Sequence, residues 1–425
     1  MNTMRSRYLF SVEKIATGLL LIYPVFMLTV KGGMNQAFFL ILLLALAVAL
    51  VRPAGMAKVI WGREWTIYAL SMIGMTAAIF ISQIFNQCLS AHPYDAASRY
   101  WLAIPVFLLL QRLELSVFTV LQYAFPVAAI AGFLLAENIG GSRSGIGTLD
   151  LIHFGDFELI LGMLALLSID WFARDPWLLR ILKILGCATG LAASFASGSR
   201  GGWLAIPVFI ALFIHFRSNK DALRIIVPSM LAALLACALL YTLNSTFHQR
   251  VNDLTNDVAV FDQGDRDTST GIRWQLYKAA VDVFSRHPVF GVGPEGFALE
   301  MKPMMEAGKL TPIAAELGRG EVHNDILSKS AGMGVFGLIA MLCVYIVPFR
   351  LFWRATKSTI AQVQRAGQMG TVFVSGFFVF GLTVECLNLT LATAFYGFTV
   401  AVLLAACYNI HHNERFTHSN KDNHV

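Results

Sequence analysis

The sequence predicts an all-α polytopic membrane protein with about twelve transmembrane helices and one large helical loop. Three observations indicate this fold class. Hydrophobic residues make up 56% of the 425 residues and charged residues only 14%, whereas soluble proteins carry roughly 25% charged residues. Apolar segments long enough to cross a bilayer recur along the chain. Successive connections between these segments contain alternately many and few Lys and Arg residues, as in a chain that crosses a membrane repeatedly.

Twelve apolar segments account for most of the chain. A helix needs about 20 mainly apolar residues to cross a hydrocarbon core of roughly 30 Å. The segments define transmembrane regions 1–243 and 323–410, followed by a cytoplasmic tail at 411–425. We expect the helices at about 11–30, 35–51, 65–87, 99–111, 116–136, 151–172, 179–197, 202–216, 223–243, 324–349, 367–386 and 390–409.

The side on which each connection lies follows from its basic residues. With a cytoplasmic N-terminus, the inner side carries 19 Lys and Arg residues, and the short outer loops carry only Lys31, Arg99, Arg143 and Arg200. Cytoplasmic loops are enriched in these residues, so both termini are expected in the cytoplasm. The net charge of +6 is then mostly a signal of topology and does not indicate nucleic-acid binding.

The N-terminal segment and the six cysteines have ordinary explanations. Arg5, Arg7 and Lys14 precede an apolar stretch, as in a signal peptide, but no Ala-x-Ala site precedes Lys31 and further spans follow. We therefore interpret this stretch as the first span. The cysteines show no CxxC or paired spacing, which favours small buried hydrophobic residues over a disulfide or a zinc site.

Residues 244–322 form the one long soluble segment, on the outer side between the ninth and tenth spans. Loops of this length without structure are uncommon and are often functional. A helix is expected within it, with Thr270 as N-cap and Pro288 beyond its end. Apolar residues recur there at helical spacing, namely Ile272, Leu276, Ala279, Ala280 and Val283.

Arg200 lies in a glycine turn between two apolar segments, at the outer boundary of the membrane. Helix N-termini present free N–H groups and a partial positive charge. Ser199 is a candidate N-cap, and Gly201 and Gly202 allow a ligand to approach the backbone. A guanidinium binds phosphate oxygens in pairs, so the turn is a candidate anion site. The alternative is a basic anchor at the membrane interface.

Arg273 repeats this pattern in the outer loop. With Thr270 as the N-cap, Arg273 lies in the first turn of the loop helix, where a cation opposes the helix dipole and favours an external anion. It lies at the edge of the apolar face, near Tyr277 and Phe284. The alternative is a surface arginine in solvent.

His323 falls where the outer loop meets the tenth span, followed by Asn324 as expected N-cap. A histidine at a helix N-terminus tends to stay neutral, and a neutral imidazole is what a general base requires. The alternative is a structural histidine. Lys329, about two turns into the span, is costly in lipid unless it is paired or faces a wet cavity. Glu385, near the outer end of the eleventh span, is a candidate partner.

Other polar residues carry weaker signals. Asp265-Arg266-Asp267 has the D-x-D pattern that holds metals and nucleotide-sugars, but two acids in a charged loop occur easily by chance, so we interpret it as a solvated loop. Asp156 and Glu158 either line a cavity or are first-turn acids of the sixth span. The sequence contains no HExxH, Walker or Gly-x-Ser-x-Gly motif, so we expect no metal or cofactor.

In order and sidedness these motifs resemble those of the O-antigen ligases and related O-antigen polymerases of Gram-negative inner membranes. Twelve spans with one large periplasmic loop before the tenth fit the family's layout, so the resemblance covers essentially the whole chain. The matching features are Ser199-Arg200-Gly201-Gly202, Arg273-Trp274, Pro288-x-x-Gly291-x-Gly293 with Phe297, His323-Asn324, and Gly332-x-Gly334 with Gly337.

The resemblance implies a metal-independent, inverting glycosyltransferase with a class C type membrane fold. It would transfer O-antigen glycan from undecaprenyl pyrophosphate to a sugar hydroxyl of lipid A–core at the periplasmic face of the inner membrane, completing lipopolysaccharide. Arg200 and Arg273 would bind the pyrophosphate and stabilise its charge as it leaves. His323 would orient or deprotonate the acceptor hydroxyl. We expect contributions to substrate binding from Ser199, Gly201, Gly202, Asn324, Lys329 and Glu385.

Three other functions remain open from the sequence. An O-antigen polymerase would use a second lipid-linked glycan as acceptor, and a protein-O-oligosaccharyltransferase would use a serine or threonine. A transporter would bind the lipid-linked glycan without cleaving it. Transporters usually carry charges near the middle of the membrane and have repeated halves. In this chain the candidates gather at the outer face, Lys329 excepted, and no inverted repeat is evident.

Overall fold

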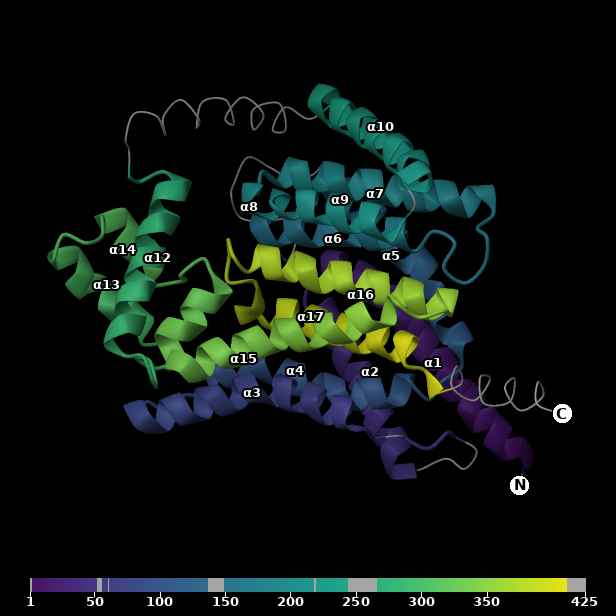
Figure 1. Ribbon diagram of the computed structural model, residues 1–425, viewed down its shortest axis with the longest axis horizontal. Helices are drawn as coiled ribbons and strands as arrows, with labels where there is room; N and C mark the ends of the chain where they lie inside the picture. The colour runs from purple at the N-terminus through teal and green to yellow at the C-terminus, as the bar shows by residue number, and fades with distance from the viewer. Residues whose placement is uncertain are drawn as a thin grey trace.

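The computed structural model describes residues 2–51, 56–59, 61–136, 149–217, 219–243 and 266–410, and this part of the chain forms helices and no strand. Most helices run roughly parallel to one long axis, and α12, α13 and α14 lie together at one end (Figure 1). The helices are α1 (Asn2–Thr29), α2 (Gly33–Val51), α3 (Arg63–Asn86), α4 (His92–Leu110), η1 (Leu115–Val120), α5 (Leu121–Ala136), α6 (Leu151–Leu167), α7 (Trp177–Ser197), α8 (Arg200–Trp203), α9 (Ala205–Phe216), α10 (Asn219–Leu243), α12 (Ser269–Arg286), α13 (Phe297–Glu306), α14 (Pro312–Gly318), α15 (Asp325–Ala355), α16 (Ala361–Phe380), η2 (Cys386–Asn388) and α17 (Thr390–Cys407).

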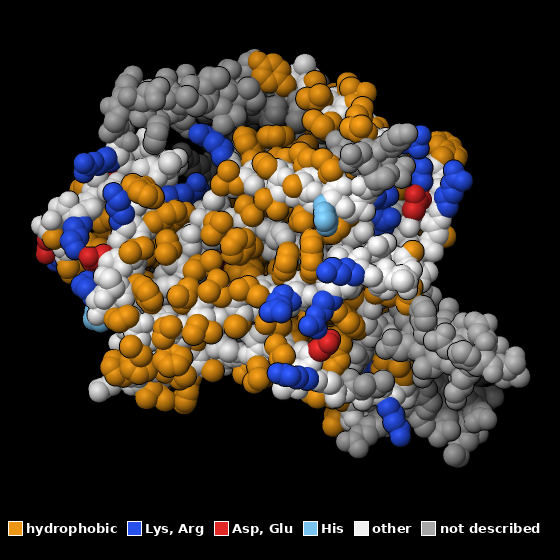
Figure 2. All heavy atoms as spheres, viewed as in Figure 1, with side chains coloured by type: hydrophobic (Ala, Val, Ile, Leu, Met, Phe, Trp, Pro, Cys, Tyr) orange, Lys and Arg blue, Asp and Glu red, His pale blue; other side chains and the backbone are white. Residues whose placement is uncertain are grey.

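Each of the twelve apolar segments overlaps a helix or, for the fifth and the eighth, a pair of helices: η1 with α5, and α8 with α9. By length and composition, seven helical segments among the described residues are able to cross a membrane. The fold is therefore that of a polytopic membrane protein, while twelve crossings remain a prediction. Hydrophobic side chains cover much of the outer surface over α9, α15 and α16, with charged residues gathered nearer the two ends (Figure 2). The seven segments are Leu9–Thr29, Gly33–Val51, Arg63–Asn86, Leu115–Ala136, Trp177–Ser197, Asp325–Ala355 and Thr390–Cys407.

The last helix, α17, lies at the centre of the bundle. Its sequence is apolar on every face, which is typical of a helix surrounded by others, and 89% of its span is buried. It packs against α2, α4 and α16. The hydroxyl of Tyr396, within α17, donates a hydrogen bond of 2.8 Å to the carbonyl of Val344 on α15. The C-terminal helix thus joins the first and last parts of the chain.

The helices α12, α13 and α14 form a small body with its own core. The apolar face predicted for α12 is buried as expected, against side chains of α13 and α14 and the start of α15. The expected N-cap was wrong by two residues, because the side chain of Thr268, not Thr270, accepts from the backbone N–H of Gly271 at 3.1 Å. Arg273 therefore lies in the second turn of α12.

Two glycine motifs of the sequence cross each other where this body meets the membrane helices. The backbone N–H of Gly293 donates to the carbonyl of Gly332 at 2.9 Å, and that of Val335 donates to Pro288 at 2.8 Å. An added Cβ at Gly291 would lie 2.3 Å from the backbone of Gly332. Gly334 adopts φ 61° and ψ −149°, which bends α15 at the crossing. The glycines are required because two backbones touch here.

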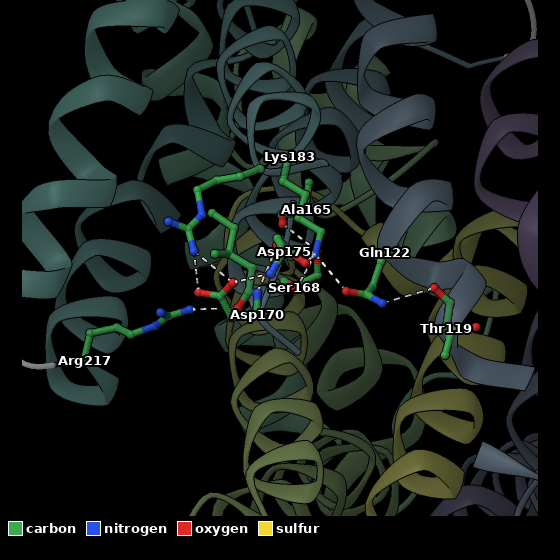
Figure 3. A network of polar contacts seen from close by, with 10 residues as sticks. Thr119, Gln122, Ala165, Ser168, Asp170, Asp175, Lys183 and Arg217 are labelled. Atoms are coloured by element: carbon green, nitrogen blue, oxygen red, sulfur yellow. Dashed lines mark hydrogen bonds and ion pairs between the residues drawn. The ribbon is translucent and has the colours of Figure 1, made fainter. Parts of the chain in front are cut away.

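At the other end of the bundle, a buried ion pair holds the connection between α6 and α7 against α7 (Figure 3). The Lys183 ammonium is fully buried and lies 2.8 Å from a carboxylate oxygen of Asp175. It also donates to the side-chain oxygen of Gln122 at 2.8 Å and to the carbonyl of Ser168 at 2.7 Å. Each of its donors has a partner, as a buried charge requires.

Several expected helix bounds were wrong. The helices α1, α4 and α16 begin earlier than expected, at Asn2, His92 and Ala361 instead of residues 11, 99 and 367, and α15 ends later, at Ala355 instead of residue 349. The sixth helix ends at Leu167, before residue 172, and the eighth segment is divided at Leu204 into α8 and α9. The eleventh ends at Phe380, before residue 386. The helix does not continue because carbonyls beyond its end bond to other elements: that of Gly381 accepts from the N–H of Asp325 and that of Leu382 from the amide of Asn324.

Candidate functional site

Arg200, Arg273 and His323 belong to elements that meet at the end of the bundle where α12 lies (Figure 1). Arg200 begins α8 and is exposed, and Arg273 is half-buried on α12. His323 is half-buried, directly before the N-cap of α15. In this part of the chain α8 packs against α6 and α16, and α12 packs against α15.

The turn of residues 381–385, after α16, connects these elements. Its Leu382 carbonyl accepts from the Tyr277 hydroxyl of α12 at 2.7 Å and from the Asn324 amide at 3.1 Å. The side chain of Thr383 fills the space beside Gly201, where an added Cβ would lie 2.5 Å from its hydroxyl. One short turn therefore contacts the helix of Arg273, the turn of Arg200 and the N-terminus of α15.

Asn324 occupies the expected position. Its side-chain oxygen accepts from the backbone N–H of Leu327 at 2.9 Å, which confirms it as the N-cap of α15. The amide group of the same side chain is held by Leu382. Asn324 therefore fixes the start of the helix directly beside His323, and its expected role in substrate binding remains a prediction.

His323 has a strained backbone and a charged neighbour. Its φ is 61°, a region that costs a non-glycine residue of order 1–3 kcal/mol and recurs at functional sites. The Tyr277 hydroxyl, 3.0 Å from its carbonyl, helps to hold this conformation. Its Nδ1 lies 2.7 Å from Oε1 of Glu321, a contact that becomes an ion pair when the imidazole is protonated.

The electrostatics of Glu321 reflect this contact. Burial opposes the charged form of the carboxyl, but the interaction with His323 outweighs burial, so the pKa of Glu321 is lowered. The backbone N–H of Glu385 adds to the same effect. A carboxylate next to the imidazole is a feature that the sequence prediction missed, although an acid two residues before the histidine was visible.

The turn around Arg200 is packed more closely than an open anion site. Ser199 occupies the N-cap position, but its hydroxyl does not bond to the backbone of α8 and is buried without a hydrogen-bond partner among the described residues. The expectation that Ser199 caps through its side chain was therefore wrong. An added Cβ at Gly202 would lie 2.0 Å from Oδ1 of Asp156. Packing against α6 and the 381–385 turn already requires Gly201 and Gly202, and their binding roles remain predictions.

Acidic and imidazole groups of α6 face the same region. Asp150 caps α6 and contacts Nδ1 of His153 at 2.6 Å. Asp156 is fully buried, with neither carboxylate oxygen hydrogen-bonded within the described ranges. It lies within electrostatic reach of His153 and Arg273. Asp156 thus lies between the turn of Arg200 and the helix of Arg273, whereas Glu158 packs against Gly132 of α5.

Lys329 and Glu385 line a cavity of about 310 Å³ between the body of α12, α13 and α14 and the helices α3 and α4. They do not form the expected ion pair. Lys329 donates to the side chain of Asn388 at 2.9 Å, while Glu385 accepts from the N–H of Val322 and, at 2.8 Å, from the Ser328 hydroxyl. Burial raises the pKa of Glu385, and the charge of Lys329 opposes this only in part.

This cavity is adjacent to the residues predicted for catalysis without containing them. Arg200, Arg273 and His323 are absent from its lining, but Glu321 is part of it. Glu321 therefore faces the cavity and contacts His323 at the same time. The Glu385 carboxylate accepts a hydrogen bond from the backbone N–H of Val322, the neighbour of Glu321, and so holds this wall of the cavity in place.

The D-x-D segment shows a structural role where it is described. Asp265 lies outside the described residues, and Asp267 accepts a hydrogen bond of 2.5 Å from the Thr311 hydroxyl at the start of α14. Within the described ranges, no group of three or more His, Cys, Asp or Glu side chains is arranged to hold a metal ion.

Comparison with known proteins identifies the region that carries these residues. Residues 185–342, which include Arg200, Arg273 and His323, match the family model of the O-antigen ligases. Over these residues, the match confirms the resemblance that the sequence motifs indicated.

Two curated proteins are similar over part of their length. An uncharacterised protein of Haemophilus influenzae is 22% identical over 267 residues, which cover 61% of this chain and 65% of that protein. An O-antigen ligase of Escherichia coli K12 is 21% identical over 245 residues, 57% of each chain. The matched regions thus span less than two thirds of either relative.

Proposed function

From the match of residues 185–342 to the O-antigen ligases, we propose that this protein is a glycosyltransferase of lipopolysaccharide synthesis. It transfers O-antigen glycan from undecaprenyl pyrophosphate to a sugar hydroxyl of lipid A–core. The reaction takes place at the periplasmic face of the bacterial inner membrane, with both termini of the chain in the cytoplasm. It inverts the anomeric carbon and uses no metal ion.

In this mechanism different residues act on the donor and on the acceptor. Arg200 and Arg273 bind the pyrophosphate and stabilise the negative charge that grows on it as the bond to the sugar breaks. His323 takes the proton of the attacking hydroxyl. The hydroxyl oxygen forms the new bond to the anomeric carbon, and the electron pair of the old bond leaves with the pyrophosphate.

The observation that carries the proposal is the common contact of three elements with one turn. The 381–385 turn bonds to Tyr277, one helical turn from Arg273, and to Asn324, the neighbour of His323. It also packs against Gly201, the neighbour of Arg200. Arg200 and Arg273 are 73 positions apart (273 − 200), and Arg273 and His323 are 50 positions apart (323 − 273). Through this turn their elements nevertheless adjoin each other, as a single reaction centre requires.

The test uses the purified protein with a lipid-linked glycan donor and lipid A–core. We expect release of undecaprenyl pyrophosphate and glycan joined to lipid A–core, both of which persist in a metal chelator. Arg200→Ala, Arg273→Ala and His323→Ala should each reduce transfer by about 100-fold or more, since loss of one electrostatic contact in a transition state costs about 2.7–4 kcal/mol.

Arg286→Ala is the matched control, because Arg286 lies on the same helix as Arg273 but pairs with Glu300 at 2.6 Å. It should retain transfer per folded molecule. Near-normal transfer by two of the three site variants would contradict the assignment of residues.

Changing the acceptor separates the alternatives. Transfer to a second lipid-linked glycan but not to lipid A–core would indicate a polymerase, and transfer to serine or threonine peptides would indicate a protein glycosyltransferase. Donor binding without release of undecaprenyl pyrophosphate in any mixture would indicate a transporter and overturn the proposal.

A further inference from the structure

Glu321 occupies a position between His323 and the cavity that Lys329 and Glu385 line. Its Oε1 atom lies 2.7 Å from Nδ1 of His323, and the two side chains are 31% and 15% exposed. The same residue forms part of the cavity wall. A carboxylate that contacts one ring nitrogen of a histidine fixes which nitrogen remains available to a substrate.

The contact is held from several sides. The Val322 N–H, between the two residues, donates to the Glu385 carboxylate. The Tyr277 hydroxyl lies 3.0 Å from the His323 carbonyl, and the adjoining Asn324 is bonded to Leu382. Both backbone and side-chain contacts therefore restrict the imidazole, as the position of a catalytic base demands.

We propose that Glu321 is a positioning residue for His323 in the glycosyl transfer proposed above, on which this inference rests. Its carboxylate contacts Nδ1, so that Nε2 is the nitrogen that receives the proton of the acceptor hydroxyl. As that proton moves to Nε2, the hydroxyl oxygen bonds to the anomeric carbon and the pyrophosphate leaves with the electron pair. The carboxylate then stabilises the imidazolium that has formed, and it does not itself take the proton.

Other charged and titratable groups surround this pair and contribute to its pH dependence. His153 of α6 acts electrostatically on Glu321, as do Glu385 and, from α12, Tyr277. Cys386 of η2 also lies within reach. Glu321 contacts the imidazole directly at 2.7 Å, so its substitution should act on proton transfer directly.

The test measures transfer by the full-length protein as a function of pH. Glu321→Gln keeps the size of the side chain and removes its charge. We expect kcat to fall about 10- to 100-fold, no more than the lower end of the roughly 10²- to 10⁴-fold that general base catalysis supplies, because His323 itself remains, with KM changed by less than about threefold. Because the carboxylate lies next to the proton-accepting group, its loss should also displace the acid limb of the kcat profile, which reports the groups that transfer protons in the enzyme–substrate complex. Glu321→Asp should restore the limb towards the wild-type position.

Glu316→Gln is the matched control, since Glu316 is 74% exposed and pairs with Arg319 at 3.3 Å; it should leave kcat and the profile unchanged. A double-mutant cycle then separates positioning from a purely structural role. When Glu321 acts through His323, the variant with both Glu321→Gln and His323→Gln loses no more activity than His323→Gln alone.

Either of two results would overturn this inference and leave the proposed function standing. The first is an unchanged kcat and pH profile for Glu321→Gln in an active protein. The second is a double variant in which the losses of activity from the two substitutions multiply. If Glu321→Gln does not fold, as judged by thermal unfolding, Glu321→Ala takes its place: a lower kcat with a displaced limb supports the inference, and wild-type kcat with a wild-type profile contradicts it. A wild-type protein that releases no undecaprenyl pyrophosphate would overturn the proposed function, and the inference with it.

Discussion

Replacement of Gly291 by alanine tests the idea that two backbones must touch where the segment after α12 meets α15. Gly291 has φ 66°, and an added Cβ would lie 2.3 Å from the backbone carbonyl of Gly332. Neither neighbour is the movable end of a side chain, so the backbone itself must shift. Two separate penalties therefore act at one position.

Each penalty has a matched glycine at which it acts alone. Gly308 has φ 72° with no atom within 4 Å of an added Cβ, so Gly308→Ala carries only the conformational cost, about 1–2 kcal/mol. Gly332 has an ordinary φ, and its added Cβ would meet the carbonyl oxygen of Gly293 at 3.1 Å, so it carries a small packing cost. For Gly291→Ala we expect about 2–5 kcal/mol, the sum of about 1–2 for φ and about 1–3 for overpacking.

Thermal unfolding of the purified variants in detergent measures these differences. The order of stability should be wild type, then Gly332→Ala and Gly308→Ala, then Gly291→Ala, and Gly291→Ala should also lose transfer per folded molecule because α12 and Arg273 move relative to α15. Equal unfolding temperatures for Gly291→Ala and Gly308→Ala would refute the close crossing.

Three further changes have outcomes that follow from single contacts. Lys183→Met leaves a buried carboxylate uncompensated and should lower stability by about 3–5 kcal/mol in thermal unfolding, whereas Lys302→Met, at an exposed side chain, should change it by about 0.5 kcal/mol or less. Tyr277→Phe removes the hydroxyl that lies between two carbonyls and should cost about 1–3 kcal/mol, with a larger loss of transfer than of folded protein. Burial opposes ionisation of Asp150, but its contacts with His153 and the N–H groups of the first turn of α6 outweigh burial and lower its pKa. The stability from Asp150 is therefore present above about pH 4 and is lost as the pH falls further, so unfolding temperature should depend less on acid pH in Asp150→Asn; an unchanged dependence would contradict this.

The helical segments were predictable because lipid allows few structures. A backbone in hydrocarbon must satisfy its own hydrogen bonds, so an apolar stretch such as 390–409 indicates a helix, and α17 spans Thr390–Cys407. The buried face of α12 followed from helical periodicity in the same way. The end of α16 was not predictable, because it depends on carbonyls that bond to residues far away in sequence, among them Asn324 and Asp325.

The candidate site was only partly visible in the sequence. Arg200, Arg273 and His323 stand out as polar residues at the ends of apolar or helical segments, where solitary charges invite an explanation. The pairing of Lys329 with Glu385 was inferred from charge alone. In the structure Lys329 donates a hydrogen bond to Asn388, and Glu385 accepts one from Ser328 instead. Charge complementarity does not indicate which side chains can reach each other, since reach depends on packing.

The order of apolar segments, the residues with unusual charge and the glycine motifs are properties of the sequence itself, because hydrophobicity, charge and backbone freedom belong to each residue. The contact of Glu321 with His323 and the 381–385 turn that joins α8, α12 and α15 came only from the tertiary structure. They depend on distances between residues remote along the chain, and those distances are set by how the helices pack.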